Sequence, residues 1–143
     1  MGISYAPALD EMLYAEKGEG AFFNGKRCVV SDVSDLSAAY FAHGSVGRFQ
    51  HIGKSENLFE LCKNTRGQRG YGDYWGYQLV SQGKVDIMID PQTKFWDVAA
   101  MACILKEAGG KMTDVFGKPL TRKIDSAIAT NGLLHDEVVK IFS

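Results

Sequence analysis

The helix expected over residues 95–110 constrains the fold of this chain more than any other stretch. Residues 98–105 are all apolar, and a helix that is apolar on every side is buried between other elements. Gly109 can adopt the left-handed conformation that commonly ends such a helix. Asp97 is then a single carboxylate in the first turn, where free N–H groups and the helix dipole attract anions. By spacing alone, the more common role of such an acid is to cap the helix.

Residues 1–36 predict an antiparallel β segment that belongs to an N-terminal sheet. Its strongest signal is the pair Asn24-Gly25, because both central residues of a type I′ hairpin turn need positive φ. We expect the strands of this segment at residues 3–5, 12–15, 21–23 and 26–30.

Residues 37–143 predict a C-terminal α/β domain, because strands and helices alternate with spacings that favour partly parallel strands. Residues 85–90 alternate with period two, so their aliphatic and acidic positions are expected on opposite faces of a strand. Ser55 is expected to cap a helix, and His135 to lie at the surface. We expect further strands at 38–42, 111–113 and 126–130, a loop or short strand at 65–71, and helices at 57–64, 72–81 and 134–142.

The composition excludes several classes of partner. Lys and Arg number 16 against 17 Asp and Glu, and the net charge of -1 provides no bulk attraction to nucleic acid or to an anionic membrane. No window approaches the roughly 18 unbroken apolar residues of a membrane span, and nothing at Met1 resembles a signal peptide. The three cysteines are far apart and odd in number, which fits a reducing cytoplasm better than a disulfide framework or a zinc site.

Several common catalytic and cofactor motifs are missing from the sequence. There is no phosphate-binding P-loop, and the only Gly-x-Gly near the N-terminus, at Gly18 and Gly20, falls in a hairpin turn instead of opening a helix. No Gly-x-Ser-x-Gly elbow occurs, and His43 and His51 are too isolated to propose a triad.

A set of carboxylates and arginines remains as the candidate for chemistry. Asp86 and Asp90 fall on one face of one strand, and Asp97 follows across a short turn. Magnesium usually binds through one or two carboxylates plus substrate phosphate, and the planar forks of Arg66 and Arg69 can meet a phosphate or carboxylate. The alternative is a set of solvated surface charges, and for Asp86 alone that alternative is favoured.

The expected helix holds the motif WDVAA at residues 96–100 and is followed by EAGG at 107–110. This pair resembles the second signature of the inositol monophosphatase superfamily of magnesium-dependent phosphatases. Residues 69–75 (RGYGDYW) and Asp90-Pro91 look more like the bacterial-type histidinol-phosphate phosphatase branch, which acts in histidine biosynthesis. The other matching segments are 2–7 (GISYAP), 10–12 (DEM), 18–25 (GEGAFFNG) and 129–132 (ATNG).

This resemblance implies a fold and a set of roles. The implied fold is the C-terminal αβα layer of the inositol-monophosphatase-like fold, preceded by an antiparallel meander of the first domain. Asp97 would bind Mg²⁺ and touch the substrate, and Arg69, Gly72, Asp73 and Asp90 would line the substrate pocket. The metal would activate a water for attack on a small phosphate monoester.

One departure from the family pattern limits these expectations. The first signature of the family, Asp-Pro-Ile-Asp-Gly-Thr, and an upstream metal-binding Glu are both missing from this sequence. In the family, the segment similar to residues 2–5 follows that signature, so the chain resembles the last half of such an enzyme. We therefore expect it to be inactive by itself.

Several alternatives stay open on the sequence. Inositol monophosphate is the runner-up substrate, and another sugar or nucleotide phosphate is a third. A chain of this kind is otherwise expected to be a non-catalytic subunit, one that forms a homodimer or pairs with a separate N-terminal half through its exposed opening strands.

Overall fold

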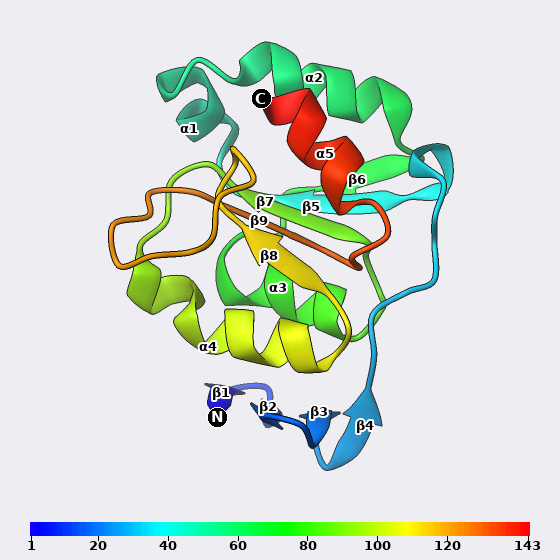
Figure 1. Cartoon of the computed structure of the whole chain (residues 1–143), viewed down its shortest axis with the longest axis vertical. Coiled ribbons are helices and arrows are strands. Elements are labelled where there is room, and N and C mark those ends of the chain that lie inside the picture. The colour runs from blue at the N-terminus through cyan, green and yellow to red at the C-terminus, as the bar shows by residue number, and fades with distance from the viewer.

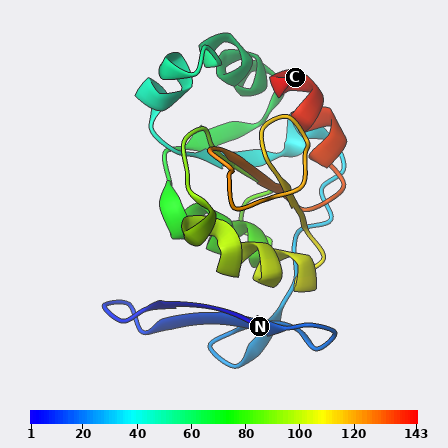
Figure 2. The ribbon, with the colours of Figure 1, turned by 60° about the vertical axis from the view of Figure 1, so that its left-hand side comes forward.

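The computed structural model describes residues 1–143 as two β-sheets and two helical layers that alternate (Figure 1). The four-stranded sheet forms one outer layer, and α3 and α4 separate it from the five-stranded sheet. The remaining helices, α1, α2 and α5, cover the far face of the five-stranded sheet, and the same order is visible in Figure 2. The α/β class and the N-terminal meander expected from the sequence are both present.

The four-stranded sheet is an antiparallel meander in chain order, and the five-stranded sheet has the order β6-β5-β7-β9-β8. In the latter, β5 pairs in parallel with β6 and β7, and the other pairs are antiparallel. The strands are β1 (Gly2–Ala6), β2 (Glu11–Glu16), β3 (Gly20–Phe23), β4 (Lys26–Cys28), β5 (Tyr40–His43), β6 (Gly67–Arg69), β7 (Ile87–Asp90), β8 (Lys111–Thr113) and β9 (Ala127–Thr130). The helices are α1 (Val46–His51), α2 (Ser55–Asn64), α3 (Asp73–Ser81), α4 (Phe95–Glu107) and α5 (His135–Phe142), with a 3-10 turn at Leu36–Ala38.

Helix α4 packs between the two sheets, as its apolar sequence predicts. Val98, Met101, Ile104 and Leu105 are buried, and the four remaining residues of 98–105 are half-buried. The approach of β1 is so close that a Cβ atom at Gly2 would lie 2.5 Å from the carbonyl oxygen of α4 residue 100. Glycine is therefore required there by contact with the helix backbone.

The hairpin between β3 and β4 has the predicted turn. Asn24 and Gly25 both have positive φ, 46° and 77°, which is the pattern of a type I′ turn. The Asn24 side chain also accepts from the Met12 N–H at 2.7 Å and donates to the Asp10 carbonyl at 3.0 Å. The turn is thereby tied to the start of the neighbouring strand.

Strand β7 shows the predicted alternation, but both of its faces are buried. Ile87 and Ile89 belong to the core on the side of α2 and α5, whereas Met88 belongs to the core on the side of α3 and α4. A central strand covered by helices on both sides has no solvent-facing side chain.

Local details depart from the sequence-based expectations at three places. Ser55 is the first residue of α2 and not its cap, because the N-cap position falls on Lys54. Helix α1 was not expected, and Ala38 belongs to a 3-10 turn, so that β5 starts at Tyr40.

None of the helices combines the length and apolar character needed to cross a bilayer.

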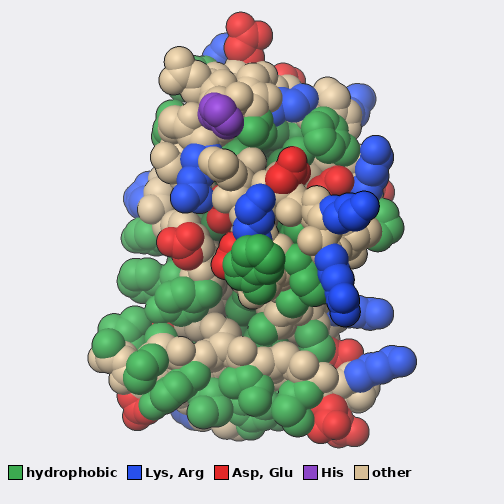
Figure 3. All heavy atoms as spheres, turned by 90° about the vertical axis from the view of Figure 1, so that its left-hand side faces the viewer, with side chains coloured by type: hydrophobic (Ala, Val, Ile, Leu, Met, Phe, Trp, Pro, Cys, Tyr) green, Lys and Arg blue, Asp and Glu red, His purple; other side chains and the backbone are tan.

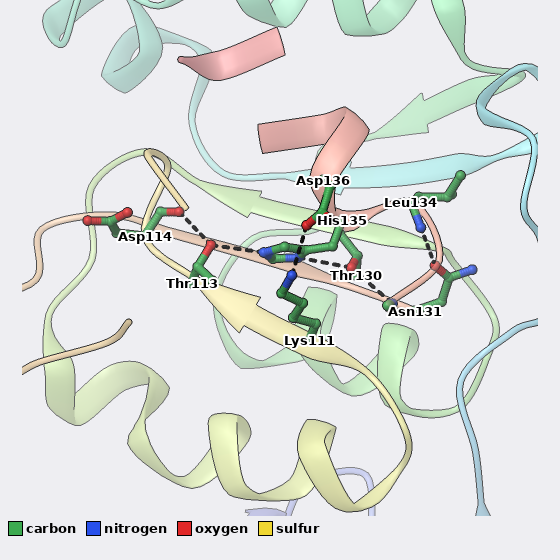
Figure 4. A network of polar contacts seen from close by, with 9 residues as sticks. Lys111, Thr113, Asp114, Thr130, Asn131, Leu134, His135 and Asp136 are labelled. Carbon is green, nitrogen blue, oxygen red and sulfur yellow. Dashed lines mark hydrogen bonds and ion pairs between the residues drawn. The ribbon is translucent and has the colours of Figure 1, made fainter. Parts of the chain in front are cut away.

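His135 is buried, which corrects the expectation of a surface residue; its ring lies between two strand hydroxyls (Figure 4). Its Nε2 lies 3.0 Å from Thr113 Oγ1, and its Nδ1 lies 3.1 Å from Thr130 Oγ1. Thr113 donates its own proton to the Asp114 carbonyl, and Thr130 Oγ1 accepts from the Gly132 N–H. The neutral ring with its proton on Nε2 satisfies every group, since Nε2–H then donates to Thr113 and Nδ1 accepts from Thr130.

This network predicts a pH-dependent stability. Burial first, and then the positive charge of Lys111, lower the pKa of His135 from 6.5 to about 4, against an opposing effect of Asp136. The unfolded chain therefore takes up the proton first as the pH falls. The contribution of His135 to the free energy of unfolding is therefore complete above about pH 6.5. It declines by at most about 3 kcal/mol as the pH falls toward 4. Urea unfolding across this range measures the decline.

A pair of variants isolates the contribution of the buried ring. His135→Gln is expected to be less stable than the parent chain at pH 7.5 but to lose less stability between pH 6.5 and pH 4. His51→Gln changes an exposed ring and should keep the parent pH profile. An unchanged profile in His135→Gln would contradict the assignment.

Candidate active site

A cavity of about 550 Å³ opens where β7, α3 and α4 meet. Asp90 ends β7, Asp97 lies in the first turn of α4, and Asp73 begins α3. Because β5 and β7 are parallel, the segment that follows β5 reaches the same edge of the sheet and contributes Arg48 from α1. The full lining comprises Arg48, Asp73, Tyr74, Tyr77, Asp90, Gln92, Thr93, Lys94 and Asp97.

Asp97 is the third residue of α4 and is exposed to solvent in the cavity. Its Oδ2 accepts from the Lys94 N–H at 2.9 Å and from the Thr93 hydroxyl at 3.5 Å, so the carboxylate does stabilise the helix start as part of a capping box. Its Oδ1 makes no hydrogen bond within the chain. One oxygen is thus held in place and the other is available to a ligand.

Asp90 forms the buried wall of the cavity and is only 3% exposed. Its Oδ1 accepts from the Gln92 N–H at 3.4 Å and lies 3.8 Å from Arg48 Nη1. Burial raises the pKa of Asp90, the Gln92 hydrogen bond and Arg48 lower it, and the nearby Asp73 and Asp97 carboxylates raise it further. The carboxylates of Asp73 and Asp97 thus act on the buried Asp90 across the cavity that all three line.

Arg48 and Asp73 connect this cavity to a second hollow of about 310 Å³. Arg48 and Asp73 line both cavities, while Gly72 lines only the second, together with His43, Gly44, Ser45, Val46 and Gly70. Asp73 has a φ of 56°, in the left-handed region that few residues with a side chain adopt. Its carboxylate is therefore placed by an unusual backbone conformation at the N-terminus of α3.

Arg69 was also expected to bind the substrate, but it lines neither cavity. Its Nη1 donates to the Gln68 carbonyl at 2.7 Å, and its side chain is exposed on β6. Arg66 lies over the ring of Tyr40, 5.3 Å from its centroid, and also lies outside both cavities. A substrate-binding role for Arg69 remains a prediction from the family resemblance alone.

Asp86 is a buried structural residue, which corrects the expectation of a solvated surface acid. It is 5% exposed and accepts from the Ser31 hydroxyl at 2.5 Å and from the Tyr40 N–H at 2.7 Å. It precedes β7, whereas Asp90 ends the strand at the cavity. Asp86 therefore joins the linker after β4 to the five-stranded sheet and takes no part in the cavity.

Arg48 and Tyr77 are the lining residues that the sequence did not single out. Both could have been suspected from position, since Arg48 follows a parallel strand at its carboxyl end and Tyr77 lies one helical turn after Asp73. Neither belongs to a recognisable motif. Their contribution to the cavity depends on how α1 and α3 pack, which local patterns do not show.

The acids of the cavity supply an incomplete metal site. No group of three or more His, Cys, Asp or Glu side chains is arranged to hold a metal ion. The free Oδ1 of Asp97 suits Mg²⁺, a hard cation that prefers carboxylate oxygen, as one ligand of a set. The residues present fit one position of a magnesium site and not the whole of it.

Comparison with known proteins decides the family. The family model described as "Inositol monophosphatase family" matches residues 1–143. This chain belongs to the inositol monophosphatase family. The resemblance drawn from the sequence motifs is thereby confirmed at the level of the family.

Two relatives and one solved structure illustrate what this chain is similar to. A histidinol-phosphatase of Streptomyces coelicolor is 38% identical over 144 residues, covering 97% of this chain and 54% of that protein. A fructose-1,6-bisphosphatase/inositol-1-monophosphatase of Thermotoga maritima is 42% identical over 142 residues, covering 99% of this chain and 54% of that protein. The solved Thermotoga maritima IMPase superposes with a TM-score of 0.87 at 40% identity, covering 98% of this chain and 54% of that structure. The chain thus spans about half the length of the relatives it matches.

Removing the Asp86 carboxylate should destabilise the fold. Asp86→Ala would leave the half-buried Ser31 hydroxyl and the Tyr40 N–H without their acceptor, at about 1–3 kcal/mol for each donor left unsatisfied. We expect a loss of roughly 2–4 kcal/mol in the free energy of unfolding, measured by urea titration. Asp32→Ala, at an exposed acid that makes no hydrogen bond, should stay within about 0.5 kcal/mol of the parent. Equal effects of the two substitutions would contradict the structural role.

Proposed function

We propose that this chain is the C-terminal portion of a magnesium-dependent phosphomonoesterase and carries the substrate-facing side of its active site. The observation that supports this most is the position of Asp97, with one oxygen held at the start of α4 and the other free in a cavity shared with Asp73 and Asp90. Membership of the inositol monophosphatase family supports the same reaction class.

In this proposal each residue of the cavity has a limited task. Asp97 would hold Mg²⁺, which when bound supplies a Lewis acid and an activated water. Thr93 and the Lys94 N–H keep the Asp97 carboxylate in position. The remaining metal ligands would come from polypeptide outside this chain, so the chain alone is expected to be inactive.

Histidinol phosphate is the proposed substrate. Three carboxylates line the cavity against the two cations Arg48 and Lys94, and Arg48 already lies 3.8 Å from Asp90. An excess of acid favours a substrate that carries positive charge besides its phosphate, as the amino group of histidinol phosphate does. The chain's similarity to a histidinol-phosphatase supports this choice, and a role in histidine biosynthesis in the cytoplasm would follow.

Inositol monophosphate is the runner-up substrate, supported by the similarity to a fructose-1,6-bisphosphatase/inositol-1-monophosphatase. A polyol has hydroxyl groups that carboxylates can accept from, but it offers no charge to balance the acids. Sugar and nucleotide phosphates are further members of the same reaction class.

Phosphate release tests the proposed activity. The 143-residue chain with Mg²⁺ should release no phosphate above the buffer rate from histidinol phosphate. A complete protein, one that carries the rest of the fold, should hydrolyse histidinol phosphate faster than inositol 1-phosphate. In that complete protein, Asp97→Ala should lower the rate of hydrolysis at least about 100-fold because a metal ligand is lost. Asp32→Ala is the matched control at an exposed acid far from the cavity.

Two results would contradict this proposal in different parts. Turnover by the isolated chain would refute the expected inactivity. If the complete protein hydrolysed inositol 1-phosphate faster than histidinol phosphate, the proposed substrate would be wrong, but the proposed reaction class would stand.

A second candidate function, as a non-catalytic association module, is favoured by the outer face of the four-stranded sheet. We define this outer face by Ile3, Tyr5, Met12, Tyr14 and Phe22. Register places Ile3 opposite Tyr14 and Tyr14 opposite Phe22, and the two rings stack with centroids 5.5 Å apart. Figure 3 shows hydrophobic side chains gathered at this end of the molecule. Helix α4 covers only the opposite face.

Strand β1 adds an unpaired edge to this apolar face. Open edges with apolar side chains template association with another chain. For the isolated chain we propose a second copy as the occupant, whereas a complete protein would place its remaining polypeptide there.

Light scattering tests the self-association. The chain should show a mass that rises with concentration, and Ile3→Lys should return it toward the monomer because charge on an edge strand opposes pairing. Phe59→Lys, at a residue 58% exposed on α2, is the matched control and should change nothing. A clean monomer at high concentration would contradict self-association.

A further inference from the structure

Tyr77 carries a buried hydroxyl that makes no hydrogen bond within the chain. The side chain is 1% exposed and lines the cavity of the candidate active site. Buried polar atoms in folded proteins nearly always have a partner, and an unpaired one is unfavourable. A hydroxyl kept unpaired at the wall of a cavity is a group held ready for a ligand.

The packing of α3 places the Tyr77 ring between the core and the cavity. Gly76 leaves no room for a side chain, since a Cβ there would collide with Met88 Sδ and the Tyr71 carbonyl. Helix α3 therefore lies directly on β7, and the next residue, Tyr77, is fixed between the core and the cavity. Its ring contributes to the core, while its hydroxyl has no partner there.

The surroundings of the hydroxyl are acidic. Burial raises the pKa of Tyr77 well above its ordinary value, and the carboxylates of Asp90, Asp73 and Asp97 raise it further, in that order. The phenol therefore stays protonated and neutral at physiological pH. It can accept a hydrogen bond without adding to the negative charge of the cavity.

These features favour one kind of ligand group. A protonated nitrogen donates hydrogen bonds to the phenol oxygen and to carboxylates at the same time, and it also balances their charge. A neutral polyol hydroxyl can donate to one of these oxygens but leaves the three acids uncompensated. Arg48 lies near one of these three acids, with its Nη1 3.8 Å from Asp90 Oδ1.

We propose that Tyr77 is a specificity-determining residue, whose hydroxyl, together with Asp73 and Asp90, holds a protonated nitrogen of the substrate. The inference rests on the proposed function, because it assigns the amine end of an amino-alcohol phosphate to this part of the cavity. It predicts discrimination between amine and polyol ligands and places no part of the phosphate chemistry on Tyr77.

Binding of unphosphorylated histidinol to the 143-residue chain tests the inference without magnesium or turnover. In an NMR titration, histidinol should shift amide resonances of residues lining the cavity, and myo-inositol at the same concentration should not. Tyr77→Phe removes a single oxygen and should weaken histidinol binding about tenfold or more, the size expected for a hydrogen bond to a charged group. Tyr14→Phe, on the outer face of the meander, is the matched control and should bind like the parent chain.

Two further measurements separate a recognition role from a structural one. Tyr77→Phe should unfold at the same or a higher urea concentration than the parent, because the lost hydroxyl had no partner. Asp73→Asn keeps a residue type that tolerates positive φ and should also weaken histidinol binding. Loss of binding in both variants, with unchanged stability, supports the inference.

The outcomes that overturn the inference differ from those that overturn the phosphatase proposal. Histidinol that fails to bind the parent chain, or that binds Tyr77→Phe as tightly as the parent, refutes the role of Tyr77. Inositol that binds as tightly as histidinol also refutes it. A complete protein, one that carries the rest of the fold, would refute the proposed function if it failed to hydrolyse histidinol phosphate, and the histidinol titration of the 143-residue chain would still decide the role of Tyr77.

Discussion

The packing of α4 between two sheets is the interaction on which the rest of this structure depends. One side of the helix meets the four-stranded meander so closely that only glycine fits at position 2. Another side meets α3 and, with it, the core beneath the five-stranded sheet. Burial of the helix contributes to stability, because apolar area removed from water stabilises the fold in proportion to its size. The same packing fixes the helix N-terminus, and therefore Asp97, at the mouth of the cavity.

The cavity combines features that oppose stability with features that suit binding. Three carboxylates line it, two of them act on the buried Asp90, and the buried Tyr77 hydroxyl has no partner. Asp73 adds a backbone conformation that is unfavourable for most residues. Strain and unpaired polar groups of this kind cluster where a protein meets its ligand, since a core selected for stability alone would remove them.

The predictions from sequence succeeded where the signal was local. The buried helix followed from eight consecutive apolar residues, and the Asn24-Gly25 turn followed from its need for positive φ. Asp97 was singled out because the family motif and the helix start coincide, although the motif could not show that one oxygen caps the helix and the other makes no hydrogen bond. Predictions failed for Asp86 and His135, because both partners of Asp86 and one of the two partners of His135 come from segments distant in the chain. Charge and polarity predict exposure by default, and only such partners reverse that expectation.

The sequence by itself determined the order of most elements, the turn chemistry, the buried helix and the family, because all four depend on residues that are neighbours in the chain or on motifs in a set order. The tertiary structure alone decided which polar side chains meet. It brought Arg48, Tyr77 and Asp97 to one cavity and left Arg69 outside it. The physical reason is that parallel pairing of β5 with β7, and the packing of α3 on β7, join segments separated by tens of residues. No local pattern encodes the distances that result.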